Sequence, residues 1–286
     1  MGILSGLESF GLKGLESADI FSDNSKKKEE KKDTPVAVVP ELTEADLIFE
    51  KSFKCPVCDK EFKNKTVKIG KAKLIGTDLD LRPKYEIIDT IKYDVILCPH
   101  CGYTALSRYF QYITGPQAKL IRANISATFV NKPDKGDVTT YDESIEKYKL
   151  ALANAIVKRS KSSEKAYICL KMAWVVRAKK EALDKNAKDY DAQLKQCTEE
   201  EDELLQNALD GFLAARQSEG FPMCGMDEST VDYLIAAESI HFGQVDVAAK
   251  LVAGILSSPV ANKRMKEKAR SLKDIMVEQI KNGKKQ

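Results

Sequence analysis

The sequence lacks any run of about 18 uncharged apolar residues, which is the minimum length for a transmembrane helix. Its apolar first stretch, residues 1–21, is interrupted by Glu8, Lys13 and Glu16, and a secretory signal needs an unbroken apolar segment. Gly6 stands where the N-myristoylation pattern requires Ser or Thr. We therefore expect a cytoplasmic protein with no transmembrane segment.

The sequence also lacks the common signatures of an enzyme. It contains no Gly-rich phosphate loop, no Ser/His/Asp set and no acidic metal cluster, and it has only two histidines. His241 is expected at the C-terminal end of a helix, where the helix dipole favours a cation, and no partner acid is evident for it. The net charge of +3 is too small to indicate a class of partner. We expect a protein that is not an enzyme.

Four of the seven cysteines form two C-x-x-C pairs, Cys55-Pro-Val-Cys58 and Cys98-Pro-His-Cys101. Zinc prefers four thiolate or imidazole ligands in a tetrahedron, and each such pair can place two sulfurs on one metal. Proline restricts the backbone after the first cysteine, and Gly102 permits the positive φ that such a turn needs. The pairs therefore predict one structural zinc ion bound by Cys55, Cys58, Cys98 and Cys101.

The residues between the two pairs, 59–97, exceed the roughly 15–20 of a compact zinc ribbon, so an inserted hairpin is expected. A rubredoxin-type iron site uses the same four thiolates and remains an alternative. A thioredoxin-type redox motif is disfavoured, because it would lie at a helix start and would need no duplicate. His100 lies between the last two ligands and is expected to point away from the metal. The remaining cysteines, Cys169, Cys197 and Cys224, are expected to be buried thiols in a reducing compartment.

The chain divides into four parts by composition. Residues 1–23 form an apolar peptide, and residues 24–50 form a flexible linker that begins with a Lys/Glu run. Residues 51–102 read as a zinc-ribbon-like β domain with strands at 66–69, 73–75 and 93–97. Residues 103–286 show helical periodicity and form a tetratricopeptide-like domain. The predicted fold class is mostly α, with a small β zinc-ribbon domain before an α-helical repeat domain.

Helices are expected near 103–112, 115–130, 141–158, 163–182, 188–219, 228–242, 245–257 and 262–281. Thr114 with Gln117 and Thr140 with Glu143 form two capping boxes, and Gly220 and Gly243 are expected helix stops. A tetratricopeptide-like alternation of small and large residues is present in the last part of the chain, and a generic helical bundle is the alternative. The residues of this alternation are Ile235, Ala236, Gly243, Ala248, Val252 and Ile255.

Several other residues are candidates for a functional role. Asp78, Asp80 and Arg82 either stabilise the turn that leads to Pro83 or form one face of a binding site, and the first interpretation is favoured. Trp174 is expected in the core. Lysines crowd residues 51–73 and basic residues coat 263–273, which makes phosphate binding an alternative, but few aromatic residues lie among them. Solvated lysines are the favoured interpretation.

The order of these parts resembles an uncharacterised bacterial family, domain of unknown function 2225. The resemblance is carried by Cys55-Pro-Val-Cys58, Asp78-Leu-Asp80, and Tyr93-Asp-Val95 leading into Cys98-Pro-His-Cys101-Gly-Tyr103, and it covers roughly residues 50–280. It implies a zinc-ribbon-like start and tetratricopeptide-like helices, and it implies no activity. Because stacked helical pairs present extended surfaces for peptides, we expect an adaptor that binds another protein or peptide. A nucleic-acid-binding zinc-ribbon protein is the alternative.

Overall fold

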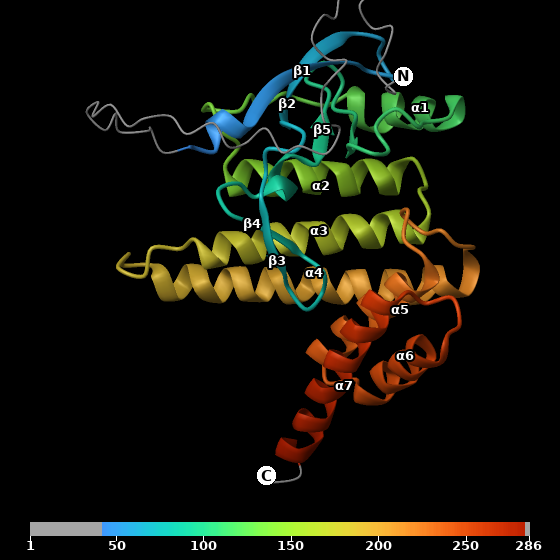
Figure 1. The fold of residues 1–286 in the computed structure, drawn as a ribbon. Coiled ribbons are helices and arrows are strands. Elements are labelled where there is room, and N and C mark those ends of the chain that lie inside the picture. Colours follow the sequence, from blue (N-terminus) through green and yellow to red (C-terminus); the bar gives the residue numbers. More distant parts are fainter. Residues whose placement is uncertain (1–41, 284–286) are drawn as a thin grey trace, which may run out of the picture. The chain divides into compact units, whose positions relative to one another are not determined.

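The structure is a computed structural model that describes residues 42–283 (Figure 1). The expected apolar peptide, 1–23, and most of the expected linker lie outside the described residues. From Leu42 on, the described chain forms one compact unit. None of its helices combines the length and the apolar composition that a membrane crossing requires.

Three antiparallel hairpins make up the β part. Strand β1 (Ile48–Lys54) pairs with β2 (Glu61–Val67), β3 (Leu74–Thr77) with β4 (Pro83–Tyr85), and β5 (Val95–Leu97) with β6 (Thr104–Leu106). Short 3₁₀ turns at Ala45–Leu47 and Thr90–Tyr93 precede β1 and β5. The β3–β4 hairpin lies between the two cysteine pairs, so the expected insertion is confirmed.

The β part differs from the prediction at both ends. Strand β1 begins at Ile48, within the stretch expected as linker, and the helix expected at 103–112 is wrong because β6 and a turn occupy it. The residues from Tyr103 to Leu106 form a short run that is completely buried, and such a run fits a helix or a strand equally well by pattern. In the structure, residues 104–106 pair with Val95–Leu97 and are therefore a strand.

The remaining elements are helices, so the mostly α fold class is confirmed. Helix α1 ends early and continues only as a π-helical turn, Arg122–Ser126, so the helix expected to reach residue 130 is too long. Both predicted capping boxes are present, at α1 and α2. The helices are α1 (Gly115–Ile121), α2 (Tyr141–Val157), α3 (Ser162–Glu181), α4 (Tyr190–Ser218), α5 (Glu228–His241), α6 (Val245–Ser257) and α7 (Lys263–Gly283).

Figure 1 shows α2, α3 and α4 stacked in that order, with the β5–β6 hairpin against α2. Helices α3 and α4 approach closely at Gly211, because a Cβ there would lie 2.8 Å from Cβ of Ala166. The core between these helices includes Tyr148, Leu170 and Phe212. A packed helical layer therefore supports the β part.

Helices α5, α6 and α7 form a second core that includes Ala236 and Ala248. Gly243 adopts a φ of 70° after α5, as the predicted helix stop requires. Every residue of α5 from Val231 to Ile240 is buried, because α5 contacts α4, α6 and α7. The tetratricopeptide-like nature of these helices stays a prediction.

Candidate metal centre

The four cysteines lie in two turns of the same backbone form, each closing a hairpin. In the first turn, the Cys55 amide donates to the Lys60 carbonyl at 3.0 Å, and the Asp59 amide donates to the Cys55 carbonyl at 2.9 Å. In the second turn, the Cys98 amide and the Tyr103 carbonyl are 2.9 Å apart, and the Gly102 amide lies 3.0 Å from the Cys98 carbonyl. We call these turns the first knuckle (55–60) and the second knuckle (98–103).

Each knuckle needs a left-handed residue directly after its second cysteine. Asp59 has a φ of 61° and Gly102 a φ of 72°. Asp tolerates this conformation better than most residues, and glycine adopts it without strain. At Gly102 the space is also limited, since a Cβ would lie 2.5 Å from the Phe129 ring. The second knuckle therefore requires glycine for two reasons: the backbone has a positive φ, and the Phe129 ring leaves no space for a Cβ.

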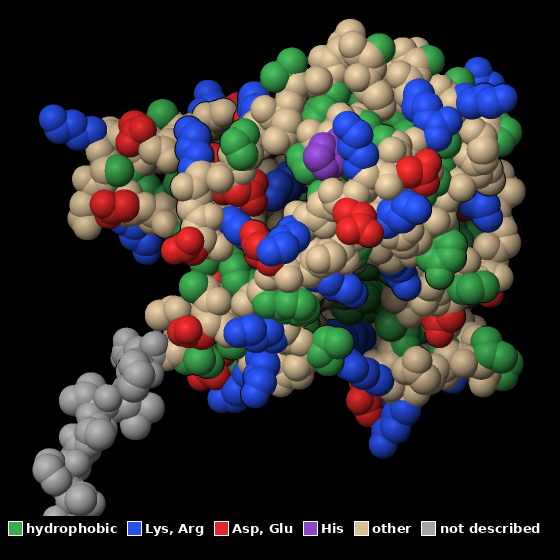
Figure 2. All heavy atoms as spheres, turned by 90° about the horizontal axis from the view of Figure 1, so that it is seen from above, with side chains coloured by type: hydrophobic (Ala, Val, Ile, Leu, Met, Phe, Trp, Pro, Cys, Tyr) green, Lys and Arg blue, Asp and Glu red, His purple; other side chains and the backbone are tan. Residues whose placement is uncertain are grey.

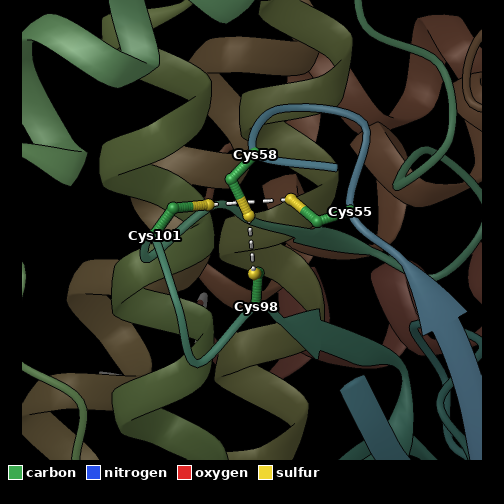
Figure 3. A group of neighbouring side chains, drawn as sticks. All are labelled: Cys55, Cys58, Cys98 and Cys101. Carbon is green, nitrogen blue, oxygen red and sulfur yellow. Dashed lines mark hydrogen bonds between the residues drawn. The ribbon is translucent and has the colours of Figure 1, made fainter. Parts of the chain in front are cut away.

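The four sulfurs converge on one point (Figure 3). The Sγ atoms of Cys55 and Cys101 are 3.6 Å apart, those of Cys58 and Cys98 are 3.7 Å apart, and all four lie within 4.8 Å of one another. These separations are too long for disulfides, whose sulfurs lie about 2.05 Å apart. A tetrahedron with metal–sulfur bonds of about 2.3 Å places its sulfurs roughly 3.8 Å apart. The donor set and the spacing both fit a tetrahedral metal ion.

The surroundings of the sulfurs favour a cation among them. Cys55 and Cys98 are completely buried, and Cys101 is nearly so. Hydrogen bonds with Cys55 and Cys98 raise the pKa of the Cys101 thiol, because neighbouring thiolates repel a further negative charge. Four thiolates can coexist at this spacing only around a positive ion. Arg122 brings a guanidinium next to the site, where its Nε donates to the Val57 carbonyl at 2.8 Å.

His100 and the remaining cysteines lie apart from the cluster, as expected. Nε2 of His100 is 3.2 Å from the Glu61 carbonyl oxygen of β2, on an exposed side of the second knuckle. Cys169, Cys197 and Cys224 are buried, and burial raises the pKa of all three thiols. None of the three therefore has the lowered pKa that a reactive thiolate requires.

The two knuckles are anchored differently. The second knuckle is fixed to the helices, because Nδ2 of Asn154 in α2 donates to the Gly102 carbonyl at 3.1 Å. The first knuckle contacts the rest through the sulfur cluster, Arg122 and a group of aromatic side chains. Phe62 and Phe110 meet edge to face with ring centres 5.8 Å apart, and Phe53 packs on Phe62 at 6.0 Å. A bound metal would thus join the β1–β2 hairpin to the helical layer.

The predicted polar turn at 78–82 is present. The Asp78 amide donates to the Arg82 carbonyl at 2.9 Å, which closes the turn. The same residues also reach α3, since Asp80 accepts a hydrogen bond from Nε1 of Trp174 at 2.8 Å and pairs with Arg177 at 2.7 Å. Arg82 pairs with Glu181 at 2.6 Å. Trp174 is in the core as expected, but the partners Arg177 and Glu181 had no signal in the sequence.

The lysines of 51–73 are partly engaged with acidic groups. Lys63 lies 3.4 Å from Glu50, and Lys73 lies 3.0 Å from Glu86. Figure 2 shows Lys and Arg side chains spread over this face with Asp and Glu side chains between them. The nucleic-acid alternative stays a prediction.

His241 has an acidic partner that the sequence analysis did not identify. Its Nε2 lies 2.7 Å from Oδ1 of Asp202, a residue of the acidic stretch 199–203 in α4. Both side chains are about half exposed, so the pair gains little from its attraction in water.

Comparison with known proteins relates the chain to a bacterial family. The model of a family described as uncharacterised proteins conserved in bacteria, DUF2225, matches residues 48–276. No curated protein and no solved structure matches the chain.

Proposed function

Because this chain belongs to the bacterial family DUF2225, which carries no assigned activity, we propose its function from the cysteine site: it is a non-enzymatic protein stabilised by one zinc ion. Cys55, Cys58, Cys98 and Cys101 hold the ion as thiolates. The observation that supports this proposal is the convergence of four sulfurs at separations of 3.6 and 3.7 Å. Zinc suits four thiolates in a tetrahedron better than the other divalent ions do, apart from iron.

The role proposed for the metal is structural. Catalytic zinc keeps one coordination position open for water or substrate, whereas four cysteines occupy all four positions. Three of the four cysteines are buried and Cys58 is partly exposed, which leaves little room for a further ligand. Structural zinc can contribute about 10 kcal/mol or more of apparent binding energy, which is folding energy for the part it joins.

Metal analysis of the purified protein tests this proposal. We expect one zinc ion per chain, and a Cys98→Ser variant should lose the ion and much of its stability. A Cys197→Ser variant changes a buried cysteine outside the site and should keep one ion. Full metal content and stability in the Cys98→Ser protein would contradict the four-ligand site, and iron in place of zinc would correct the identity of the metal.

We further propose that the protein acts as an adaptor for another protein. Support comes from large aliphatic side chains that are exposed within a short segment around β3 and β4, and exposed groups of this kind mark interaction surfaces. Ile69 is 99% exposed, Ile75 61% and Leu74 51%. The apolar peptide 1–23, outside the described residues, is a second candidate for binding a partner.

Capture of partners from the native cytoplasm tests the adaptor role. Four proteins are compared: the full chain, a chain without residues 1–23, an Ile69→Ser/Ile75→Ser variant, and a Val260→Ser control. Val260 is 81% exposed but lies outside the β3–β4 segment. We expect the control to retain the captured proteins, and the double variant or the truncated chain to lose them. If no version captures a partner, the adaptor role is wrong.

A further inference from the structure

A second site-like feature lies where the loop between β3 and β4 meets helices α3, α4 and α5. A cavity of about 370 Å³ opens there, and none of the seven cysteines lines it. Its apolar wall is formed by Leu79, Leu205 and Ala237. Its polar wall contains one arginine, one histidine and five carboxylates: Asp78, Asp80, Glu181, Glu201 and Glu238.

Four of these carboxylates are paired with cations. Asp80 and Glu201 both contact Arg177, at 2.7 and 2.6 Å, and Lys180 also contacts Glu201. Glu181 pairs with Arg82. Asp78 pairs with Arg82, Lys84 and Arg177. Together with Lys180, the cations that pair with these carboxylates number four. Four cations thus face five carboxylates.

Glu238 is the carboxylate that is left over. Its side chain is 1% exposed, and among the described residues neither carboxylate oxygen has a hydrogen-bond partner. A buried polar group without a partner costs several times more than a satisfied one, and a buried charge costs more still. Burial, with the nearby Asp80, raises the pKa of Glu238 well above its ordinary range. The side chain therefore needs a donor that the described residues do not provide.

The geometry points to a small molecule with one primary ammonium group and a short aliphatic chain as the ligand of this cavity, and we propose that Glu238 binds that ammonium. When Glu238 is ionised, the positive charge of an ammonium would balance it, and the ammonium offers three N–H donors. The apolar wall would receive the chain. A chelated metal ion is the poorer fit, because within residues 42–283 the four cysteines are the only group of three or more potential ligands that lie within 4.8 Å of one another.

n-Butylamine is the probe that tests the site, titrated into the full-length protein in phosphate buffer and followed by ligand-observed NMR. Ligands of this size bind weakly, so a dissociation constant on the order of 1 mM is expected. 1-Butanol has the same chain without the charge, and tetramethylammonium has the charge without N–H donors. Both should bind at least tenfold more weakly.

Two variants locate the binding. Glu238→Gln should weaken butylamine binding at least tenfold, whereas Glu228→Gln, the same change at the exposed first residue of α5, should leave it unchanged. Should the Glu238→Gln protein fail to fold, Leu79→Trp gives a second test, because Leu79 lies in the loop at the cavity and is 40% exposed. The larger ring should fill the cavity mouth and weaken binding to a similar extent.

The same titration can overturn the proposal. Saturable binding that Glu238→Gln and Leu79→Trp both leave unchanged would place the amine elsewhere. No saturable binding up to about 20 mM, roughly twenty times the expected dissociation constant, would mean that Glu238 is satisfied by water alone.

Discussion

At the scale of single residues, the two knuckles place strict demands on the position after the second cysteine. Gly102 and Gly243 share nearly the same φ, 72° and 70°. Only Gly102 is crowded, by the Phe129 ring, whereas nothing lies within 4 Å of a Cβ at Gly243. Alanine substitutions at the two positions therefore separate the free-energy cost of the left-handed backbone from the free-energy cost of the steric clash.

We predict that Gly102→Ala lowers the free energy of unfolding by about 3 kcal/mol or more, since it adds a steric clash to a left-handed strain of roughly 1–2 kcal/mol. Gly243→Ala should show the strain alone. Urea unfolding of both variants measures the difference. Equal losses would mean that Phe129 moves aside without cost.

Glu238 leads to a prediction on pH. Its pKa in the folded protein is raised by burial and by Asp80, with Arg177 acting in the opposite direction. A carboxyl of raised pKa favours folding below the ordinary value of 4.5, and this contribution is lost as the pH rises from there toward the folded pKa. In amine-free buffer, the native protein should therefore lose stability relative to Glu238→Gln as the pH rises from about 5 to about 8.

Urea unfolding of the two proteins at both pH values provides the measurement. Burial acts to raise the pKa of Asp78 and of Glu181, but their Lys84 and Arg82 partners outweigh it and lower both pKa values, so the two carboxyls stay ionised across this pH range in both proteins. Their contribution cancels in the difference. A difference that does not change with pH would mean that Glu238 is ionised and stabilised in the fold.

At the scale of elements, the packing of α3 on α4 depends on a small residue. Gly211 lies within α4, where alanine would raise helix propensity by about 1 kcal/mol. A Cβ at this position would, however, lie 2.8 Å from the Ala166 Cβ. Gly254 of α6 is the matched control, because it is exposed and has nothing within 4 Å of an added Cβ.

We predict that Gly254→Ala stabilises the protein by about 0.5–1 kcal/mol, as propensity alone requires. Gly211→Ala should be neutral or destabilising, because the two helices must separate. Thermal unfolding of the two variants gives the comparison. If both variants gain stability equally, α3 and α4 are not held at this distance by Gly211.

The elements also show which parts of the fold the sequence could predict. Helices α2 to α7 were predicted because their periodicity extends over many residues and their caps are local, as at Thr140. Strand β1 was missed, because Ile48–Lys54 mixes apolar and charged residues without a regular alternation and lies beside a linker-like stretch. The segment of strand β6 was predicted as a helix. It is a strand because it pairs with β5, and a local sequence pattern does not show such pairing.

The cysteine site and the Glu238 cavity also differ in how far the sequence could predict them. The cysteine ligands were predictable because C-x-x-C spacing places two ligands in one turn and proline and glycine mark that turn. Glu238 gave no signal, because α5 is buried on all sides and its sequence does not reveal which face meets Arg177. A charge surplus in a cavity arises only when segments far apart in sequence come together.

At the scale of the whole molecule, the cysteine site joins parts that backbone hydrogen bonds do not. In the described chain, β1–β2 and β5–β6 are separate two-stranded sheets. A two-stranded hairpin is marginally stable alone in water, so β1–β2 relies on the site, on the aromatic cluster and on the packing of Ile48 and Val67 with Ile88 and Tyr93. Helices α3 and α4 have their own core, which includes Leu170 and Phe212.

We predict that a strong chelator frees the β1–β2 hairpin before it affects the helices. Hydrogen exchange followed by mass spectrometry should show faster exchange at 48–67 and 95–106, and little change at 162–181 and 190–218. Addition of zinc should restore protection. If exchange rises equally in all segments, the metal supports the whole fold as one cooperative unit.

The separation of the knuckles along the chain has a consequence for biosynthesis. Cys58 and Cys98, whose sulfurs meet, are 40 positions apart in sequence. At about 5–20 residues per second, a bacterial ribosome needs roughly 2–8 s to add those positions. During that interval the first pair of thiols has emerged without its partners. For these seconds, the nascent chain carries the first two ligand cysteines without the second two. The two exposed thiols can then be oxidised, or can bind a different soft metal ion, before the site is complete.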